Sequence, residues 1–354
     1  MSVRIENIAD TNTQSKKMET ISVIIPCYNC EREIEACIRA ILRSTCPPLE
    51  IIAVDDCSKD GTREKIKSLS RGLSGKIKLT ATTKNSGPAR ARNTGAKVAE
   101  GEYLFFLDSD TQVLPDALAN FAKRIEQCDA VVGIYDEEPS NSGASPRYKA
   151  MLYAYLLGQR GVQTYDQFSA SCAGIRSALY RDLGGYDEWF PPGLDFENEE
   201  FGHRISSRYR MVLDPAVRAR HRFPGFRKMT RTFFQRTALW VEMFMLRRKF
   251  STLAGTPKTG ISSMALLGSA VLLPLTALHP FGFIPSLATY LIYLYGYTGF
   301  FGYVAKKRPA YLPTAILLNH YYTLVIACGA LYGLFRVVTG GSQIIRKFTL
   351  SRNG

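Results

Sequence analysis

The sequence predicts an α/β domain with a mostly parallel sheet, followed by an α-helical membrane region. Two observations predict the first part: short apolar runs alternate with helical patterns, as in βαβ units, and acidic clusters stand at the ends of two of the runs. A third predicts the second part. Beyond residue 260, apolar stretches approach or exceed the ~20 residues that a helix needs to cross a bilayer.

Five apolar runs have the length of buried strands. They are 21–25, 50–54, 76–80, 103–107 and 130–134. Helical spacing of apolar residues, together with Pro88 at a helix start, predicts the intervening elements. These helices are 31–43, 62–69, 88–99, one beyond Pro115, 147–160 and 196–208. Because helices connect the strands, we expect a parallel sheet with helices on both faces, and ligands at the carboxyl ends of its strands.

The charge of the chain is concentrated in one segment. The 354 residues are 46% hydrophobic and 21% charged, which excludes a disordered or fibrous chain, and the net charge is +14. Residues 204–249 hold thirteen Lys and Arg against only Asp214 and Glu242. This belt directly precedes the apolar stretches, so we expect it to contact anionic membrane lipids. A nucleic-acid partner would instead need basic residues spread over the soluble domain. Because the basic residues are not distributed in this way, we expect no nucleic-acid partner.

The C-terminal part divides into an interfacial segment and a membrane region. Apolar and basic residues occupy separate faces over 226–245, which predicts an amphipathic helix at the bilayer surface, with an ordinary surface helix as the alternative. Three apolar stretches follow, at 261–278, 283–305 and 313–338. The first contains Pro274 and is followed by His279-Pro280, so it can form a hairpin with the second.

The number of spans stays open between two and three. The third stretch holds Asn319 and His320, which we expect to face protein or a polar cavity. If all three stretches span, the basic residues of the C-terminal tail lie on the non-cytoplasmic side of the membrane. The positive-inside rule disfavours that placement. Two spans with one re-entrant or interfacial segment avoid this conflict. The predicted organisation is therefore a flexible tail (1–20), the α/β domain (21–225), the interfacial region (226–260) and the membrane region (261–354).

The eight cysteines predict a reducing compartment. The polar segment before residue 21 lacks the apolar core of a secretory signal, so we expect free thiols. Cys27 and Cys30 have the spacing of half a zinc site. No second close CxxC or CxxH accompanies them, and we favour packing in a βα unit.

Two acidic clusters and one basic turn carry the candidate chemistry. Asp108 and Asp110 follow the strand 103–107, and two carboxylates placed this way can hold Mg²⁺ or Mn²⁺, which neutralises a departing diphosphate. Asp55 and Asp56 end an earlier strand, where they can accept hydrogen bonds from a base or ribose, or simply cap the next helix. Residues 84–93 combine a Gly-containing turn with cations at a helix start, which suits phosphates.

Together these elements resemble the family 2 inverting glycosyltransferases of the GT-A fold, from residue 21 to about 221. The matching segments are Ser22 to Asn29, Val54 to Thr62, Asn85 to Gly95, and Leu107 to Asp110. Four such segments in this order are far more specific than any one of them. The resemblance implies a Rossmann-like sheet and a nucleotide-sugar donor, such as a UDP- or GDP-sugar.

The resemblance also implies roles for individual residues. Asp55 or Asp56 would contact the nucleotide base, and Asp108 and Asp110 would hold the metal and the diphosphate. His221 matches a position where some relatives place a metal-contacting histidine, although a structural role is equally compatible. The remaining donor-site positions by resemblance are Pro26, Tyr28, Asn85, Arg92 and Asn93.

The expected catalytic base is replaced in this chain. In the family an acidic pair precedes an arginine, and alignment on Arg204 turns that pair into Glu197-Asn198. Asn cannot accept a proton from the acceptor hydroxyl. Glu197 is our first candidate base, with Glu199 and Asp195 as alternatives. An acceptor that is already an ionised lipid phosphate would need no base.

These observations predict a multi-pass membrane glycosyltransferase with its catalytic domain in the cytoplasm, where nucleotide sugars are found. The expected acceptor is a lipid-linked saccharide in glycan or polysaccharide biosynthesis. A polyprenyl phosphate acceptor is the first alternative, favoured by Asn198. A catalytically silent membrane scaffold with the same fold is the second, and the intact Asp108-Ser109-Asp110 sequence weighs against it.

Overall fold

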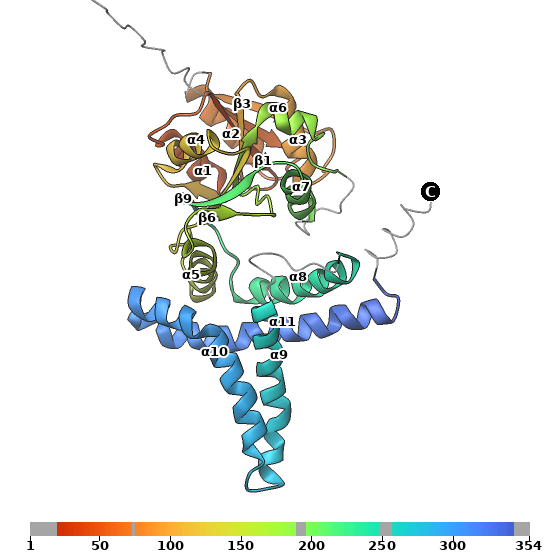
Figure 1. The fold of residues 1–354 in the computed structure, drawn as a ribbon. Coiled ribbons are helices and arrows are strands. Elements are labelled where there is room, and N and C mark those ends of the chain that lie inside the picture. Colours follow the sequence, from red (N-terminus) through yellow and green to blue (C-terminus); the bar gives the residue numbers. More distant parts are fainter. Residues whose placement is uncertain (1–19, 73–74, 189–195, 248–256, 343–354) are drawn as a thin grey trace, which may run out of the picture.

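A computed structural model describes residues 20–72, 75–188, 196–247 and 257–342. The predicted tail up to residue 19, Asp195 and the basic C-terminal tail lie outside the described residues. Figure 1 shows an α/β domain above a group of long helices. The predicted fold class, a mostly parallel α/β sheet followed by a helical region, is confirmed.

One mixed sheet forms the centre of the domain, in the order β3-β2-β1-β4-β8-β6-β9-β5, with β7 also paired to β9. Strands β1 to β4 are parallel, β8 is antiparallel to β4 and β6, and β6 is parallel to β9. The strands are β1 Ile21–Cys27, β2 Glu50–Asp55, β3 Ile77–Ala81, β4 Tyr103–Leu107, β5 Thr111–Val113, β6 Ala130–Tyr135, β7 Gln163–Thr164, β8 Cys172–Arg176 and β9 Met211–His221.

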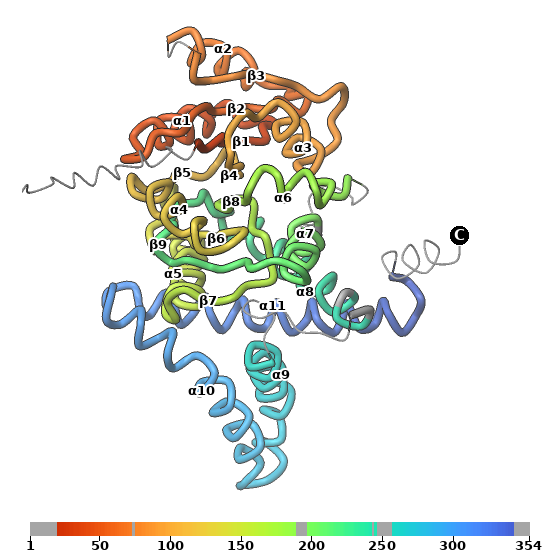
Figure 2. The backbone as a smooth tube through the Cα atoms, turned by 45° about the horizontal axis from the view of Figure 1, so that its top comes forward, coloured from red at the N-terminus to blue at the C-terminus, as the bar shows by residue number. Residues whose placement is uncertain are grey.

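Helices cover both faces of this sheet because successive strand residues point to opposite sides. In β4, Phe105 packs with α1 and α4, whereas Phe106 packs with α3, α6 and α7. Figure 2 shows the same layers after rotation. The helices are α1 Ile34–Leu42, α2 Thr62–Gly72, α3 Pro88–Val98, α4 Ala117–Ile125, α5 Ala144–Gly158, α6 Ser177–Asp182 and α7 Phe196–Ser206.

The C-terminal helices are arranged in two directions (Figure 1). They are α8 Phe226–Arg247, α9 Pro257–Leu272 with the 3-10 turn Leu273–Ala277, α10 Phe283–Lys307, and α11 Leu312–Val338 after the 3-10 turn Pro309–Tyr311. Helices α9 and α10 form a hairpin that points away from the domain, whereas α11 runs across the top of this hairpin and alongside α8. By length and composition, Pro257–Ala277 and Pro309–Val338 are the candidate membrane spans among the described helices.

Helix α5 connects the domain to these helices. Tyr148 and Met151 of α5 pack with Phe300 of α10 and Tyr322 of α11 in one buried cluster. Asn319 of α11 is fully buried, where it accepts a 2.6 Å hydrogen bond from the hydroxyl of Tyr293 and donates a 2.9 Å bond to that of Tyr148. The expectation that Asn319 faces protein is confirmed.

Candidate metal and nucleotide site

Asp108, Asp110 and His221 come together although they are far apart in sequence. The carboxylates follow β4, whereas His221 ends β9, and the pairing of β5 with β9 places Thr111 opposite His221. One ligand atom from each of the three side chains lies within 4.8 Å of the others. His221 Nε2 is 3.4 Å from Asp110 Oδ1. Among the described residues, this is the group of His, Cys, Asp or Glu side chains arranged to share a metal ion.

The two carboxylates suit Mn²⁺ or Mg²⁺, whereas the imidazole is a ligand typical of transition metals, so the set as a whole fits Mn²⁺ better than Mg²⁺. The imidazole packs in a three-ring cluster with Tyr135 and Phe223, whose centroids each lie 4.8 Å from it and 5.3 Å from one another. Burial raises the pKa of Asp110, with Asp108 adding to the shift and His221 opposing it. A divalent cation would offset this burial and repulsion, so these residues match the predicted metal group.

Arg92 connects the metal site to helix α7. Its Nη2 donates to Asp108 Oδ1 at 2.9 Å, and its Nη1 lies 3.5 Å from Glu197 Oε1. Burial alone would lower the pKa of Arg92, but Asp108, Tyr186 and Glu197 together raise it, so the guanidinium remains charged. Its Cζ also lies 5.4 Å from the ring centroid of Tyr186, within cation–π distance.

The acidic residues at the start of α7 lie in different environments. Glu197 is buried against Arg92, whereas Glu199 is partly exposed. Asn198 accepts a 3.3 Å hydrogen bond from the Tyr186 hydroxyl, and its carbonyl accepts one from the Phe168 amide. Arg204 pairs with Glu200. Glu197, the first candidate base, is therefore linked to the metal-site carboxylate Asp108 through Arg92.

Asp55 and Asp56 are both buried and accept hydrogen bonds from the backbone nearby. Asp55 Oδ1 accepts from the Ser58 amide at 3.0 Å. Asp56 accepts from the Thr82 hydroxyl and from the amides of Ser86 and Gly87. Asp56 thus fixes the turn that begins α3 and places Arg92. A nucleotide contact by either carboxylate stays a prediction.

The other predicted donor-site residues occupy two places. Pro26 and the exposed Tyr28 lie at the end of β1, and Asn85 is exposed in the turn before α3. Asn93 instead points inward. Its side-chain Nδ2 donates hydrogen bonds to the backbone carbonyl of Tyr186 and to the carboxylate of Glu188. Its Oδ1 accepts hydrogen bonds from the hydroxyl of Tyr180 and from the backbone N–H of Tyr186.

Sequence reasoning missed Tyr135 and Tyr186 as neighbours of the site. A signal existed for Tyr186, because Gly184-Gly185 marks a tight turn directly before it, and both glycines have positive φ. Tyr135 ends β6, whose strand was predicted, but its ring contact with His221 depends on β9, which was not. The eight cysteines are free, and no metal-sharing group among the described residues includes Cys27 or Cys30.

Comparison with known proteins finds one family over the N-terminal part of the chain. The family model described as "Glycosyl transferase family 2" matches residues 22–184. Glycosyltransferase GlyG of Streptococcus pneumoniae is 32% identical over 146 residues, which are 40% of this chain and 45% of that protein. The UDP-Glc:alpha-D-GlcNAc-diphosphoundecaprenol beta-1,3-glucosyltransferase WfgD of Escherichia coli is 41% identical over 90 residues, covering 25% of this chain and 34% of that protein. The matches thus span less than half of the length of these curated relatives.

A solved structure supports the same fold over most of the chain. The mannosyltransferase PcManGT from Pyrobaculum calidifontis, solved with GDP-Man and Mn²⁺, superposes with a TM-score of 0.52. The alignment covers 88% of this chain and 87% of that one, at 18% identity. At this identity the likeness concerns the fold alone, and it agrees with the predicted GT-A architecture.

Proposed function

We propose that this chain, whose residues 22–184 form a family 2 glycosyltransferase domain, is a membrane-bound inverting enzyme. It transfers a sugar from a nucleotide-sugar donor to a lipid-linked saccharide acceptor. The single observation that carries the proposal is the convergence of Asp108, Asp110 and His221 at the carboxyl end of β4. The name of the relative WfgD, which includes a UDP-sugar and a diphosphoundecaprenol-linked saccharide, supports the same donor and acceptor classes.

The proposed chemistry assigns separate roles to the residues around the metal site. Asp108, Asp110 and His221 would hold Mg²⁺ or Mn²⁺, which supplies charge neutralisation for the leaving diphosphate. Arg92 positions Asp108 and adds positive charge beside it. The acceptor oxygen attacks the anomeric carbon as the bond to the diphosphate breaks, and the configuration inverts. Glu197 is the proposed acceptor of the hydroxyl proton.

A polyprenyl phosphate acceptor is the second candidate, and two features favour it. Asn198 occupies the position expected for the base, and the carboxylate of Glu197 is already paired with Arg92. An ionised phosphate attacks without losing a proton, so it needs neither residue. A catalytically silent scaffold is disfavoured because its metal set would have no reason to remain assembled.

We also propose that the enzyme is attached to the cytoplasmic face of a membrane by the α9–α10 hairpin. No Asp, Glu, Lys or Arg occurs between Lys258 and Lys306. Both ends of the hairpin therefore carry positive charge, as expected for segments that stay on the cytoplasmic side. Hydropathy selects α11 rather than α10 as a span, but α11 is held against α5 and α8, which favours an in-plane position for it.

The first test is nucleotide binding and donor turnover by the full chain in detergent. A panel of UDP- and GDP-sugars is assayed with Mn²⁺ or Mg²⁺, and the variant Asp110→Asn is compared with Asp116→Asn, which changes an exposed carboxylate at the start of α4. We expect Asp110→Asn to weaken metal-dependent binding by more than about 100-fold, and Asp116→Asn to leave it unchanged. Equal binding by both variants would overturn the metal assignment.

The second test separates the two acceptors. With a lipid-linked saccharide, Glu197→Gln should lower kcat by about 100-fold or more, because the general base is lost, whereas Glu199→Gln should retain most activity. With polyprenyl phosphate, turnover that survives in Glu197→Gln would support transfer to a phosphate. Folded protein that neither binds nor turns over any donor would favour the silent scaffold.

A further inference from the structure

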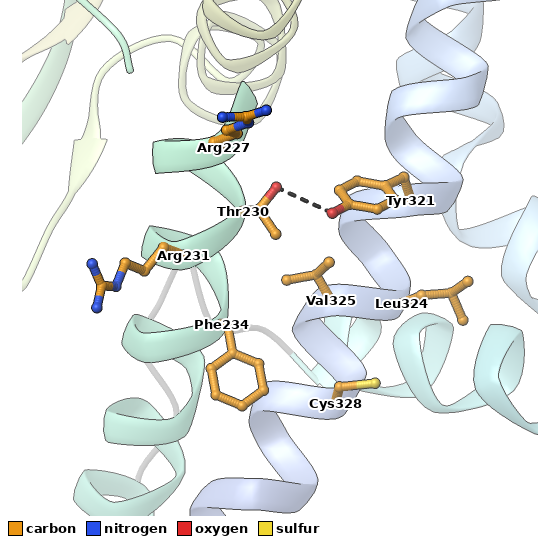
Figure 3. Close-up of a pocket in the computed structure, with 8 residues that line it drawn as sticks. All are labelled: Arg227, Thr230, Arg231, Phe234, Tyr321, Leu324, Val325 and Cys328. Carbon is orange, nitrogen blue, oxygen red and sulfur yellow. Dashed lines mark hydrogen bonds between the residues drawn. The ribbon is translucent and has the colours of Figure 1, made fainter. Parts of the chain in front are cut away.

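An open groove runs along the seam where helices α8 and α11 pack together, with a volume of about 460 Å³ (Figure 3). Each helix contributes one stripe of residues with the spacing of a single helical face. The lining residues are Arg227, Thr230, Arg231 and Phe234 from α8, and Tyr321, Leu324, Val325 and Cys328 from α11. No acidic side chain is among them.

The two ends of this groove differ in chemistry. Arg227 lies at one end, beside the 3.3 Å hydrogen bond between the hydroxyls of Thr230 and Tyr321. Phe234 and Cys328 lie at the other, beyond Val325 and Leu324. A ligand that matched this surface would have an anionic head and an apolar chain.

The cations at the polar end are available to a ligand. Arg227 and Arg231 are both exposed, and neither has an acidic partner within the part of the chain that the structure describes. Figure 3 shows Arg231 turned toward the outer side of α8, so the two guanidinium groups flank the first turns of this helix. Arginine binds phosphate with several donors at once, which suits a lipid phosphate.

The polar end of the groove is also the end that is nearer to the metal site along the chain. His221 ends β9, and α8 begins at Phe226, so only four residues of the chain separate the last metal-site residue from the helix. Six extended residues reach at most about 22 Å, which limits the distance between the Cα atoms of His221 and Arg227. The segment between them is fixed, because Asn141 bonds to both backbone groups of Phe223.

We propose that this groove binds the isoprenoid phosphate of the acceptor, with its phosphate at Arg227 and its chain along Phe234, Leu324 and Val325. The proposal rests on the proposed function and deepens it, because it names where the acceptor docks. The bound phosphate would stand between the apolar groove and the metal site. A helix from a protein partner is less well matched, since Arg227 lies at one end of the groove and Arg231 turns away from it.

The test uses Cys328 as a reporter in the full detergent-solubilised chain. Cys328 is the exposed thiol among the described cysteines, whereas Cys46 and Cys57 are partly buried and the rest are buried. Its alkylation by a maleimide is followed by mass spectrometry while polyprenyl phosphate is added. We expect the lipid to slow alkylation at Cys328, with no change at Cys46.

Matched variants then locate the phosphate. The variant Arg227→Gln should need at least about tenfold more lipid for the same protection, because it loses its charged hydrogen bonds to the phosphate. Lys228→Gln, an exposed cation of α8 outside the groove lining, should behave as the unchanged chain. Equal protection in Arg227→Gln, or equal protection of the unchanged chain by phosphatidylglycerol at the same concentration, would overturn the proposal.

Kinetics distinguish this proposal from the proposed function. Val325→Trp fills the apolar part of the groove, so the acceptor KM should rise while metal-dependent donor hydrolysis is retained. Retained hydrolysis with an unchanged acceptor KM would refute the groove and leave the glycosyltransferase assignment intact. Lipid protection of Cys328 in a protein without donor turnover would refute the enzyme and leave a lipid-binding groove.

Discussion

At the scale of the residue, Arg92 is the group that links the separate parts of the site. It lies in α3, and Asp56 fixes the turn directly before that helix. Its side chain contacts Asp108 after β4 and Glu197 in α7. Both Arg92 and Glu197 are almost completely buried. A buried pair of this kind adds little net stability, but removing one partner leaves an uncompensated charge.

We predict that Arg92→Ala lowers the free energy of unfolding by about 3 to 5 kcal/mol. The double variant Arg92→Ala/Glu197→Gln should be less destabilised than Arg92→Ala, because the buried carboxylate left behind is neutralised. Thermal or denaturant unfolding of the four members of this cycle measures the coupling. Additive effects would show that the pair is not energetically coupled.

The sequence identified the residues that carry charge at the site but not all of their contacts. Asp108, Asp110 and His221 were predicted as one set, and the structure brings them together. Asn93 was predicted to line the donor pocket, yet its amide bonds to the 180–188 segment. A side chain in the middle of α3 can turn toward a ligand or toward the core, and the packing of α6 that decides this is not encoded locally.

At the scale of the element, the strands of the parallel half were predictable because they are continuous apolar runs. The predictions missed β5, β7, β8 and β9. Strand β9 contains Asp214-Pro215 and alternates exposed arginines with buried residues, so it has no apolar run to detect. It is nevertheless the strand that carries His221.

The packing of α8 on α11 depends on two glycines. An added Cβ would lie 2.5 Å from the Phe234 carbonyl oxygen at Gly329, and 2.4 Å from the Ala238 carbonyl oxygen at Gly333. Gly329 and Gly333 are four residues apart, so they form the small-residue face that lets two helices approach closely in membrane proteins. A Cβ added at Gly302 of α10 would have no neighbouring atom within 4 Å.

We predict that Gly329→Ala and Gly333→Ala each destabilise the detergent-solubilised chain by about 1 to 3 kcal/mol, because the two backbones must separate. Gly302→Ala is the matched control, and it should be neutral or stabilising by less than about 1 kcal/mol, since alanine favours a helix. Thermal unfolding compares the three variants. A similar melting temperature for all three would contradict close packing of α8 on α11.

At the scale of the whole molecule, the α/β domain is joined to the helices on one side. Tyr303 and Lys307 of α10 contact Glu137, and the Tyr322 hydroxyl of α11 bonds to Ser145 of α5. These contacts join both α10 and α11 to the domain. The hairpin of α9 and α10 then projects on the opposite side from the metal-site domain (Figure 1).

We predict that both ends of the hairpin lie on the side of the catalytic domain. Lys258→Cys and Lys306→Cys, each in a Cys328→Ser background, should react with a membrane-impermeant maleimide in vesicles that carry the domain outside. Leu278→Cys, at the turn of the hairpin, should not react under the same conditions. Labelling at only one of the two lysine positions would contradict a hairpin and favour an odd number of spans.

The pairing of β9 also sets an order of events during synthesis. Asp110 and His221 are separated by more than a hundred residues, and β9 is the last strand of the sheet. A growing chain can therefore form the parallel half early, yet its metal set remains incomplete until β9 has been made. Since α8 follows β9 after only four residues, the candidate metal set is completed at nearly the moment when the C-terminal helices begin to emerge.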